Sequence, residues 1–301
     1  MISMNLVFEQ ILIIFGYVAV GLGAGKLGLV NPEQRKYLTR LCLDLMLPFT
    51  ILSAASMQVG ADGFRSLAIA MAVMFAVIGG TLILSMAVCR VLHAERKLSV
   101  GMTSLIAFPN LTFLGLPLCI ALFGEIAVLY NSAALIAFNV VFFLVQAPLF
   151  TGDRISLKSV LTVPTVATFV LLGMLMLDLH WPAPVQTVMS NVGSMVTPMS
   201  LIVIGVMLSE SDFLSIFREK AEYPVVIVRN FLVPLISLGI LHFVPMATPV
   251  RLCVLVFLSC PCATMTSIYA IQTDIQTIIS YGGDYLTICC GMCFGAFAQI
   301  T

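Results

Sequence analysis

Charged residues are scarce in this chain of 301 residues. Only 9% of its residues are charged, whereas soluble domains carry about 25%. Hydrophobic residues make up 60% of the chain, and the mean hydropathy is +1.12. This composition excludes a soluble globular domain and predicts an integral membrane protein whose surroundings are the lipid bilayer. The 14 basic and 14 acidic residues balance to a net charge of zero, so we expect no nucleic-acid partner.

Histidine is also scarce, and the cysteines lack the companions that a metal site needs. The chain has three histidines, all near predicted loops, and nine cysteines. A metal or redox site would combine a spaced cysteine pair with a second group of ligands, and none lies near these cysteines. We interpret the cysteines as buried small apolar residues. We therefore expect no metal, no cofactor and no enzymatic activity.

Apolar stretches fill nearly the whole sequence. A membrane-spanning helix needs roughly 20 apolar residues. The chain divides into ten such stretches, at about 5–25, 37–58, 66–89, 98–123, 126–150, 159–177, 186–208, 221–244, 252–273 and 275–300. Little sequence remains for a soluble domain, so the function must reside in the helices. The predicted fold is an all-α integral membrane protein with ten transmembrane helices.

Basic residues gather in alternate loops. The loops after the first, third, fifth and seventh spans hold 11 of the 14 basic residues, namely Lys26, Arg35, Lys36, Arg40, Arg90, Arg96, Lys97, Arg154, Lys158, Arg218 and Lys220. The other loops hold only Arg65 and Arg251. Because basic loops stay in the cytoplasm, both termini are predicted to lie outside the cell membrane.

Prolines interrupt two of the apolar stretches. The fourth contains FPNLTFLGLPL at 108–118, with Pro109 and Pro117, and the ninth contains SCPCATMTS around Pro261. A proline inside a helix deletes a backbone hydrogen bond and clashes with the carbonyl four residues earlier. Unpaired backbone is tolerated at membrane depth only where protein buries it or where it lines a water-filled cavity. We expect both helices to break at these prolines, twice in the fourth span.

The interruptions recur at half the chain length. Pro261 lies 152 residues after Pro109, and Pro198 lies 150 after Pro48. Five spans per half is an odd number, so the second copy would be inverted in the membrane. We predict a first five-helix repeat at 1–150 and an inverted second repeat at 151–301. Their broken fourth and ninth helices would cross, which is typical of a secondary transporter with its substrate site at the crossing.

Small polar residues follow each break. Asn110 and Thr112 follow Pro109, where a half-helix restarts with free N–H groups and a positive dipole end that suits a carboxylate. These residues either bind substrate or cap the broken ends, and in both cases they would line the cavity. The candidates for substrate binding and crossing are Pro109, Asn110, Thr112, Asn131, Cys260, Pro261, Thr264 and Thr266.

Asn131 belongs to a second polar pattern, on the fifth span. Asn131, Asn139 and Gln146 follow one another at spacings of 8 and 7, which places them roughly on one helical face. They line the cavity or form hydrogen bonds between helices.

Two acidic residues fall inside predicted spans and are the candidates for ion coupling. Asp44, four residues before Pro48, either holds H⁺ or Na⁺ or pairs with Arg40 at the interface. Asp284 is the other candidate, and Arg229 either pairs with it or extends toward the cytoplasm. H⁺ and Na⁺ are thus the candidate coupling ions.

At residues 109–117, PNLTFLGLP, the chain resembles the auxin efflux carrier family. Plant members of that family carry proline–asparagine followed at the same spacing by glycine–x–proline. The resemblance extends to the ten spans, the inverted halves and Pro261. It implies an elevator-like carrier in which spans one, two, six and seven form a dimerising scaffold. Spans three to five and eight to ten would form the transport domain, with Asn110 contacting a substrate carboxylate.

Two departures from the plant pattern indicate the substrate class. The third span, 66–89, lacks the charged residues that support the site in plant carriers, and the central loop is reduced to TGDRISLK. The chain therefore looks like a short bacterial member. The resemblance then implies a small carboxylate such as malonate or malate, rather than auxin.

Other functions stay open as alternatives. A bile-acid-type Na⁺ symporter shares the crossed-helix architecture. An intramembrane aspartyl protease could use Asp44 and Asp284 as an acid–base pair. The two motifs of such proteases, tyrosine–aspartate and glycine–x–glycine–aspartate, are absent. Leu43 precedes Asp44, and Tyr281 stands in place of the first glycine before Asp284.

Overall fold

The computed structural model describes residues 4–152, 154–210, 222–263 and 266. Every regular element in these ranges is a helix, and the β-type contact found there is an isolated bridge between Pro109 and Cys262. Five helices in the described ranges are long and apolar enough to cross a membrane: Pro32–Ser56, Ala61–Val91, Ile126–Thr151, Ala183–Ser209 and Tyr223–Phe243. The all-helical architecture is thus confirmed over these ranges. The ten-span inverted repeat stays a prediction, and its last span, 275–300, lies outside the described residues.

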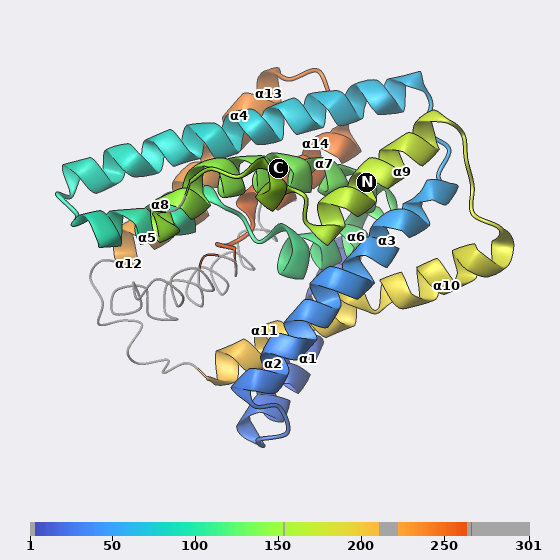
Figure 1. Ribbon diagram of the computed structural model, residues 1–301, viewed down its shortest axis with the longest axis horizontal. Coiled ribbons are helices and arrows are strands. Elements are labelled where there is room, and N and C mark those ends of the chain that lie inside the picture. Colours follow the sequence, from blue (N-terminus) through green and yellow to red (C-terminus); the bar gives the residue numbers. More distant parts are fainter. Residues whose placement is uncertain (1–3, 153, 211–221, 264–265, 267–301) are drawn as a thin grey trace. The chain divides into compact units, whose positions relative to one another are not determined.

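The helices follow one another with short connections. In chain order they are α1 (Met4–Lys26), α2 (Pro32–Leu41), η1 (Cys42–Met46), α3 (Leu47–Ser53), η2 (Ala54–Ser56), α4 (Ala61–Val91), α5 (Arg96–Ala107), η3 (Leu111–Gly115), α6 (Leu116–Phe123), α7 (Ile126–Val141), η4 (Phe142–Gln146), α8 (Ala147–Thr151), η5 (Leu157–Val160), α9 (Val163–Met176), α10 (Ala183–Ser194), α11 (Val196–Ser209), α12 (Glu222–Ile227), η6 (Val228–Leu232), α13 (Val233–Phe243) and α14 (Thr248–Ser259). Figure 1 shows these elements along the chain.

Four π-helical turns each precede a proline. The turns η1, η3, η4 and η6 are followed by Pro48, Pro117, Pro148 and Pro234, each the second residue of the next α-helix. Proline has no N–H and crowds the carbonyl four residues back, so the helix widens locally to i→i−5 bonding, as from the N–H of Leu47 to the carbonyl of Cys42. The expectation of a second break at Pro117 is therefore wrong, because this proline widens the helix instead of ending it.

The chain divides into two compact units. The first consists of the described part of Met1–Ala68, of Thr112–Ile136 and of Leu161–Glu210. The second consists of Ile69–Leu111, Ala137–Val160 and the described part of Ser211–Thr301. The first unit thus holds α1 to α3, α6 and α9 to α11. The second holds most of α4 together with α5, α8 and α12 to α14.

Within the first unit, α1 and α11 pack with their backbones in contact. A Cβ on Gly21 would lie 2.0 Å from a carbonyl oxygen of α11, and one on Gly205 would lie 2.1 Å from a carbonyl oxygen of α1. One turn further along, Gly25 faces Ser209. Small residues four apart on both helices are typical of close packing between membrane helices. In Figure 1 the blue α1 lies beside the gold α11.

The helix α3 packs against α9 and α10 in the same unit. A Cβ on Gly193 would lie 2.7 Å from the Cα of Thr50, so here too the backbones touch. The hydroxyl of Thr50 donates to the carbonyl of Gly193 at 2.7 Å. At the end of α3, the Trp181 indole N–H donates to the carbonyl of Leu52 at 3.0 Å.

An aromatic cluster marks the core of the second unit. Phe108 is fully buried, and its ring centroid lies 5.2 Å from that of Phe138 and 5.0 Å from that of Phe142, both edge-on. A neighbouring apolar cluster contains Cys89, Met102, Leu105, Ile106, Val225, Val228, Val233 and Cys262. This cluster includes Leu105 and Ile106 of the last turn of α5 and Cys262 of the bridge.

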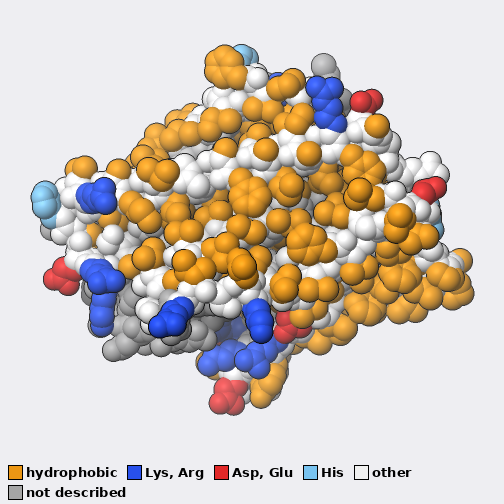
Figure 2. Space-filling view, turned by 45° about the horizontal axis from the view of Figure 1, so that its top comes forward, with side chains coloured by type: hydrophobic (Ala, Val, Ile, Leu, Met, Phe, Trp, Pro, Cys, Tyr) orange, Lys and Arg blue, Asp and Glu red, His pale blue; other side chains and the backbone are white. Residues whose placement is uncertain are grey.

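Large apolar side chains also cover the outside. Ile83, Phe169 and Leu235 are each more than half exposed, and Figure 2 shows hydrophobic side chains over most of the face in view. Such extensive apolar surface marks contact with an apolar environment. It agrees with a chain that lies in the lipid bilayer.

Candidate functional site

Two helices of the second unit stop inside the protein. The helix α5 ends at Ala107, and Phe108 turns to an extended conformation with φ −106° and ψ 116°. The helix α14 ends at Ser259, and Cys260 is likewise extended, with φ −60° and ψ 148°. The breaks predicted at Pro109 and Pro261 are therefore confirmed.

The two extended segments pair with each other. The N–H of Asn110 donates to the carbonyl of Pro261 at 2.7 Å, and the N–H of Ala263 donates to the carbonyl of Phe108 at 2.9 Å. The result is an antiparallel bridge between Pro109 and Cys262. We call the segments 106–110 and 258–263 the crossover.

Arg229 of η6 caps the two interrupted helices. Its guanidinium donates to the carbonyl of Ile106 at 3.1 Å, of Leu258 at 2.8 Å and of Cys260 at 2.9 Å. The side chain is 1% exposed. The expectation that Arg229 extends toward the cytoplasm is wrong, because helix-end carbonyls that lack intrahelical donors hold it inside. Its other predicted partner, Asp284, lies outside the described residues.

Side-chain hydrogen bonds add further polar contacts around the crossover. The hydroxyls of Ser104 and Thr266 lie 2.8 Å apart and are both buried, which joins α5 to the segment after the second break. The hydroxyl of Thr81 on α4 lies 3.4 Å from the carbonyl of Ala107. Buried backbone at a helix end needs such partners.

The second unit brings five of the predicted site residues together. Pro109, Asn110, Cys260 and Pro261 form the crossover, with Thr266 just beyond it. Asn110 is 2% exposed. Cys260 contributes its backbone carbonyl to Arg229, while its thiol donates to the carbonyl of Val256 on its own helix at 3.2 Å.

The other predicted site residues are assigned to the first unit or lie outside the described residues. Thr112 and Asn131 are buried in the first unit, and Thr264 lies outside the described residues. Both polar side-chain atoms of Asn131 are buried without a hydrogen-bond partner, so Asn131 stays a candidate for contact with a ligand.

The predicted polar face of the fifth span is buried. Asn131 and Gln146 are fully buried and Asn139 is nearly so. The side-chain amide of Gln146 donates to the carbonyl of Val100 on α5 at 2.9 Å. For Gln146 the interpretation as an interhelical hydrogen bond is therefore confirmed.

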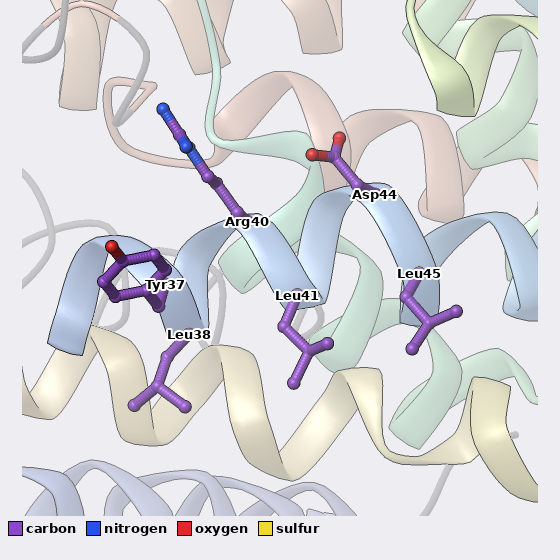
Figure 3. Close-up of a pocket in the computed structure, with 6 residues that line it drawn as sticks. All are labelled: Tyr37, Leu38, Arg40, Leu41, Asp44 and Leu45. Atoms are coloured by element: carbon purple, nitrogen blue, oxygen red, sulfur yellow. The ribbon is translucent and has the colours of Figure 1, made fainter.

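Asp44 lies on the surface of the first unit. It lines an open pocket of about 420 Å³ together with Tyr37, Leu38, Arg40, Leu41 and Leu45. In Figure 3 the side chains of Arg40 and Asp44 project from the same side of their helix, away from those of Leu41 and Leu45. Asp44 belongs to the π turn η1 and is exposed there. A role in ion coupling stays a prediction for this residue.

A family model described as membrane transport protein matches residues 6–150. Over these residues the chain is similar to that family. The match confirms the predicted resemblance to auxin efflux carriers. The family consists of membrane transporters, and the match gives the protease interpretation no support. No curated protein matches the chain in a sequence comparison.

The sequence did not indicate the roles of Arg229, Phe108, Ser104 and Thr81 at the site. A charged residue inside an apolar span does carry information, because such residues almost always face the protein interior. Applied to Arg229, that rule places the guanidinium inside the helical bundle. Phe108 precedes Pro109 and shares the apolar character of its neighbours, so nothing in the sequence distinguished it.

Proposed function

We propose that this membrane transporter is a secondary carrier of a small organic anion with a carboxylate group. The observation that carries the proposal is the crossover, where two half-helices of a transporter-family chain stop and pair inside the protein. Interrupted helices of this kind supply the substrate sites of secondary transporters. The half-helix that restarts after Asn110 presents a positive dipole end, which favours an anion.

We also propose an elevator-like mechanism with a homodimeric scaffold. The first unit contains predicted spans one, two and seven and nearly all of span six, together with 112–136 of predicted spans four and five. Within it, α1 packs against α11 and α3 against α10, backbone against backbone. The second unit contains both interrupted ends and the residue that caps them. A unit that carries the complete crossover can move as one body, which supports this division of roles.

The remaining parts of the proposal come from the sequence. The distribution of basic loops supports a cell-membrane protein with both termini outside. The short central loop and the uncharged third span support a small carboxylate substrate such as malonate or malate. The family match ends at residue 150, where the first repeat is proposed to end.

The experiment begins with a thermal-shift screen of the purified chain against monocarboxylates and dicarboxylates. A ligand that binds the folded state raises its stability by mass action. With the ligand so identified, Asn110→Ala should weaken binding by roughly 10-fold to 100-fold, because a lost charge-assisted hydrogen bond costs about 1.5–3 kcal/mol. Calorimetric titration measures the change.

The matched control is Asn191→Ala, which removes an exposed asparagine from α10 of the first unit. It should bind the anion as the unchanged chain does. Equal affinity in the unchanged chain and in a folded Asn110→Ala variant would overturn the assignment of Asn110. Na⁺-dependent binding of steroid anions in place of small carboxylates would overturn the substrate class.

A further inference from the structure

The crossover concentrates negative potential in the core of the second unit. The helices α5 and α14 both have 12 residues, and both point their C-terminal carbonyls into the crossover. A helix C-terminus carries the equivalent of roughly −0.5 elementary charge, so two of them together present about −1. An uncompensated charge of this size in a water-free core is strongly unfavourable.

The guanidinium of Arg229 matches that potential in charge and in shape. Its Nη1 faces α5 through the carbonyl of Ile106, while its Nη2 and Nε face the end of α14 through Leu258 and Cys260. One planar cation therefore bridges both helix ends. The ion pairs found among the described residues join Arg35 to Glu210 and His180 to Asp178, so backbone carbonyls and not a carboxylate compensate this cation there.

The π turn η6 presents Arg229 to the crossover. Three consecutive residues of this turn, Val228, Arg229 and Asn230, are all buried. In a regular α-helix three consecutive side chains spread over about 200° of the helix surface. The widened turn, which precedes Pro234, directs this stretch into the core of the second unit.

We propose that the Arg229 guanidinium is the resident cation of the crossover and occupies the position at which these carbonyls would otherwise bind Na⁺. Unwound carbonyls and half-helix C-termini are the groups that coordinate Na⁺ in transporters with broken helices. Here the protein's own side chain meets that requirement. The crossover therefore needs no metal ion. This inference concerns ion occupancy and holds whatever anion the chain carries.

The first test uses the unaltered chain, purified in detergent. Its melting temperature is measured in NaCl and in choline chloride at equal ionic strength. We expect the same melting temperature in both salts, because the crossover already holds its cation. A rise specific to Na⁺ that is no larger in Arg229→Ala than in the unaltered chain would overturn the proposal, since removing the guanidinium would then open no Na⁺ site at the crossover.

The second test empties the position with Arg229→Ala. The variant should melt several degrees lower, and methylguanidinium should recover much of that loss by occupying the vacated site. Urea has a similar planar shape and similar donors but no charge. Recovery by methylguanidinium and not by urea supports a resident cation, whereas equal recovery by both would reduce Arg229 to a neutral hydrogen-bond donor and overturn the proposal.

Two further variants complete the test. Arg229→Lys keeps the charge, so it should melt above Arg229→Ala and stay unresponsive to Na⁺. A Na⁺-specific rise in the lysine variant would contradict a resident cation. The matched control is Arg251→Ala, because Arg251 also donates to backbone carbonyls of the second unit, those of Val244 and Met246, but lies away from the crossover. Methylguanidinium should leave its melting temperature unchanged, and an equal rise there would overturn the site assignment.

Discussion

The helices of the two units are held together by different kinds of contact. The helices α1 and α11 of the first unit keep their backbone bonds within themselves and meet through Gly21, Gly25, Gly205 and Ser209. The second unit contains two helices that stop in its core, and polar groups from other elements complete their backbone hydrogen bonds. Continuous helices can associate through close packing of small residues. Interrupted helices also need hydrogen-bond donors placed at the free carbonyls of their ends.

The difference predicts which kind of substitution lowers the stability of each unit. The first unit should fail when atoms are added to its helix contacts. The second should fail when atoms or charges are removed around the crossover. Each of the following changes tests one side of this comparison.

The largest effect is expected from Phe108→Ala in the second unit. The ring is fully buried between Phe138 and Phe142, directly beside the break. Removing a buried phenylalanine costs about 3–5 kcal/mol. Thermal unfolding of the purified chain measures the loss. The control is Phe169→Ala, at an exposed position on α9. A loss of stability in Phe108→Ala no greater than in that control would show that the Phe108 ring does not stabilise the core at the crossover.

An intermediate effect is expected from Gly205→Ala in the first unit. The added methyl group would lie 2.1 Å from a backbone carbonyl oxygen of α1, so the two helices must move apart. Overpacking of this kind costs about 1–3 kcal/mol. The control is Gly173→Ala on α9, where a Cβ meets nothing within 4 Å. Equal melting temperatures for the two variants would show that α1 and α11 do not rely on backbone contact.

The smallest effect is expected from Asp44→Asn, because this charge lies on the surface of the first unit. Exposed substitutions usually change stability by no more than about 0.5 kcal/mol. In proteoliposomes, gradient-driven accumulation and substrate exchange should both be unchanged. Loss of accumulation with exchange retained would instead assign ion coupling to Asp44, and Arg40→Gln on the same pocket serves as the control.

The sequence predicted the features of this chain that depend on local chemistry. Apolar length gave the helices, and the backbone effect of proline gave the breaks at Pro109 and Pro261. The residues around them then followed as site candidates, and the structure groups Asn110 and Thr266 there. Such features need no knowledge of which helices become neighbours.

Features that depend on neighbouring helices escaped prediction. A long side chain such as Arg229 can extend to either side of its helix, and only the carbonyls supplied by α5 and α14 decide between them. Proline in a helix permits a break or a wider turn, and the sequence did not distinguish Pro117 from Pro109. The exposure of Asp44 likewise depends on which face of its helix the first unit covers.

The π turns change which residues share a face of these helices. Each turn inserts one residue beyond regular α-helical spacing, which rotates everything downstream by about 100°. Deleting a single residue from Phe142–Gln146 would remove the extra residue and turn α8 by about 100° around the helix axis. Side chains before the turn would keep their directions, whereas those after it would face different neighbours. Residue spacing in this chain therefore predicts a shared face only between successive π turns.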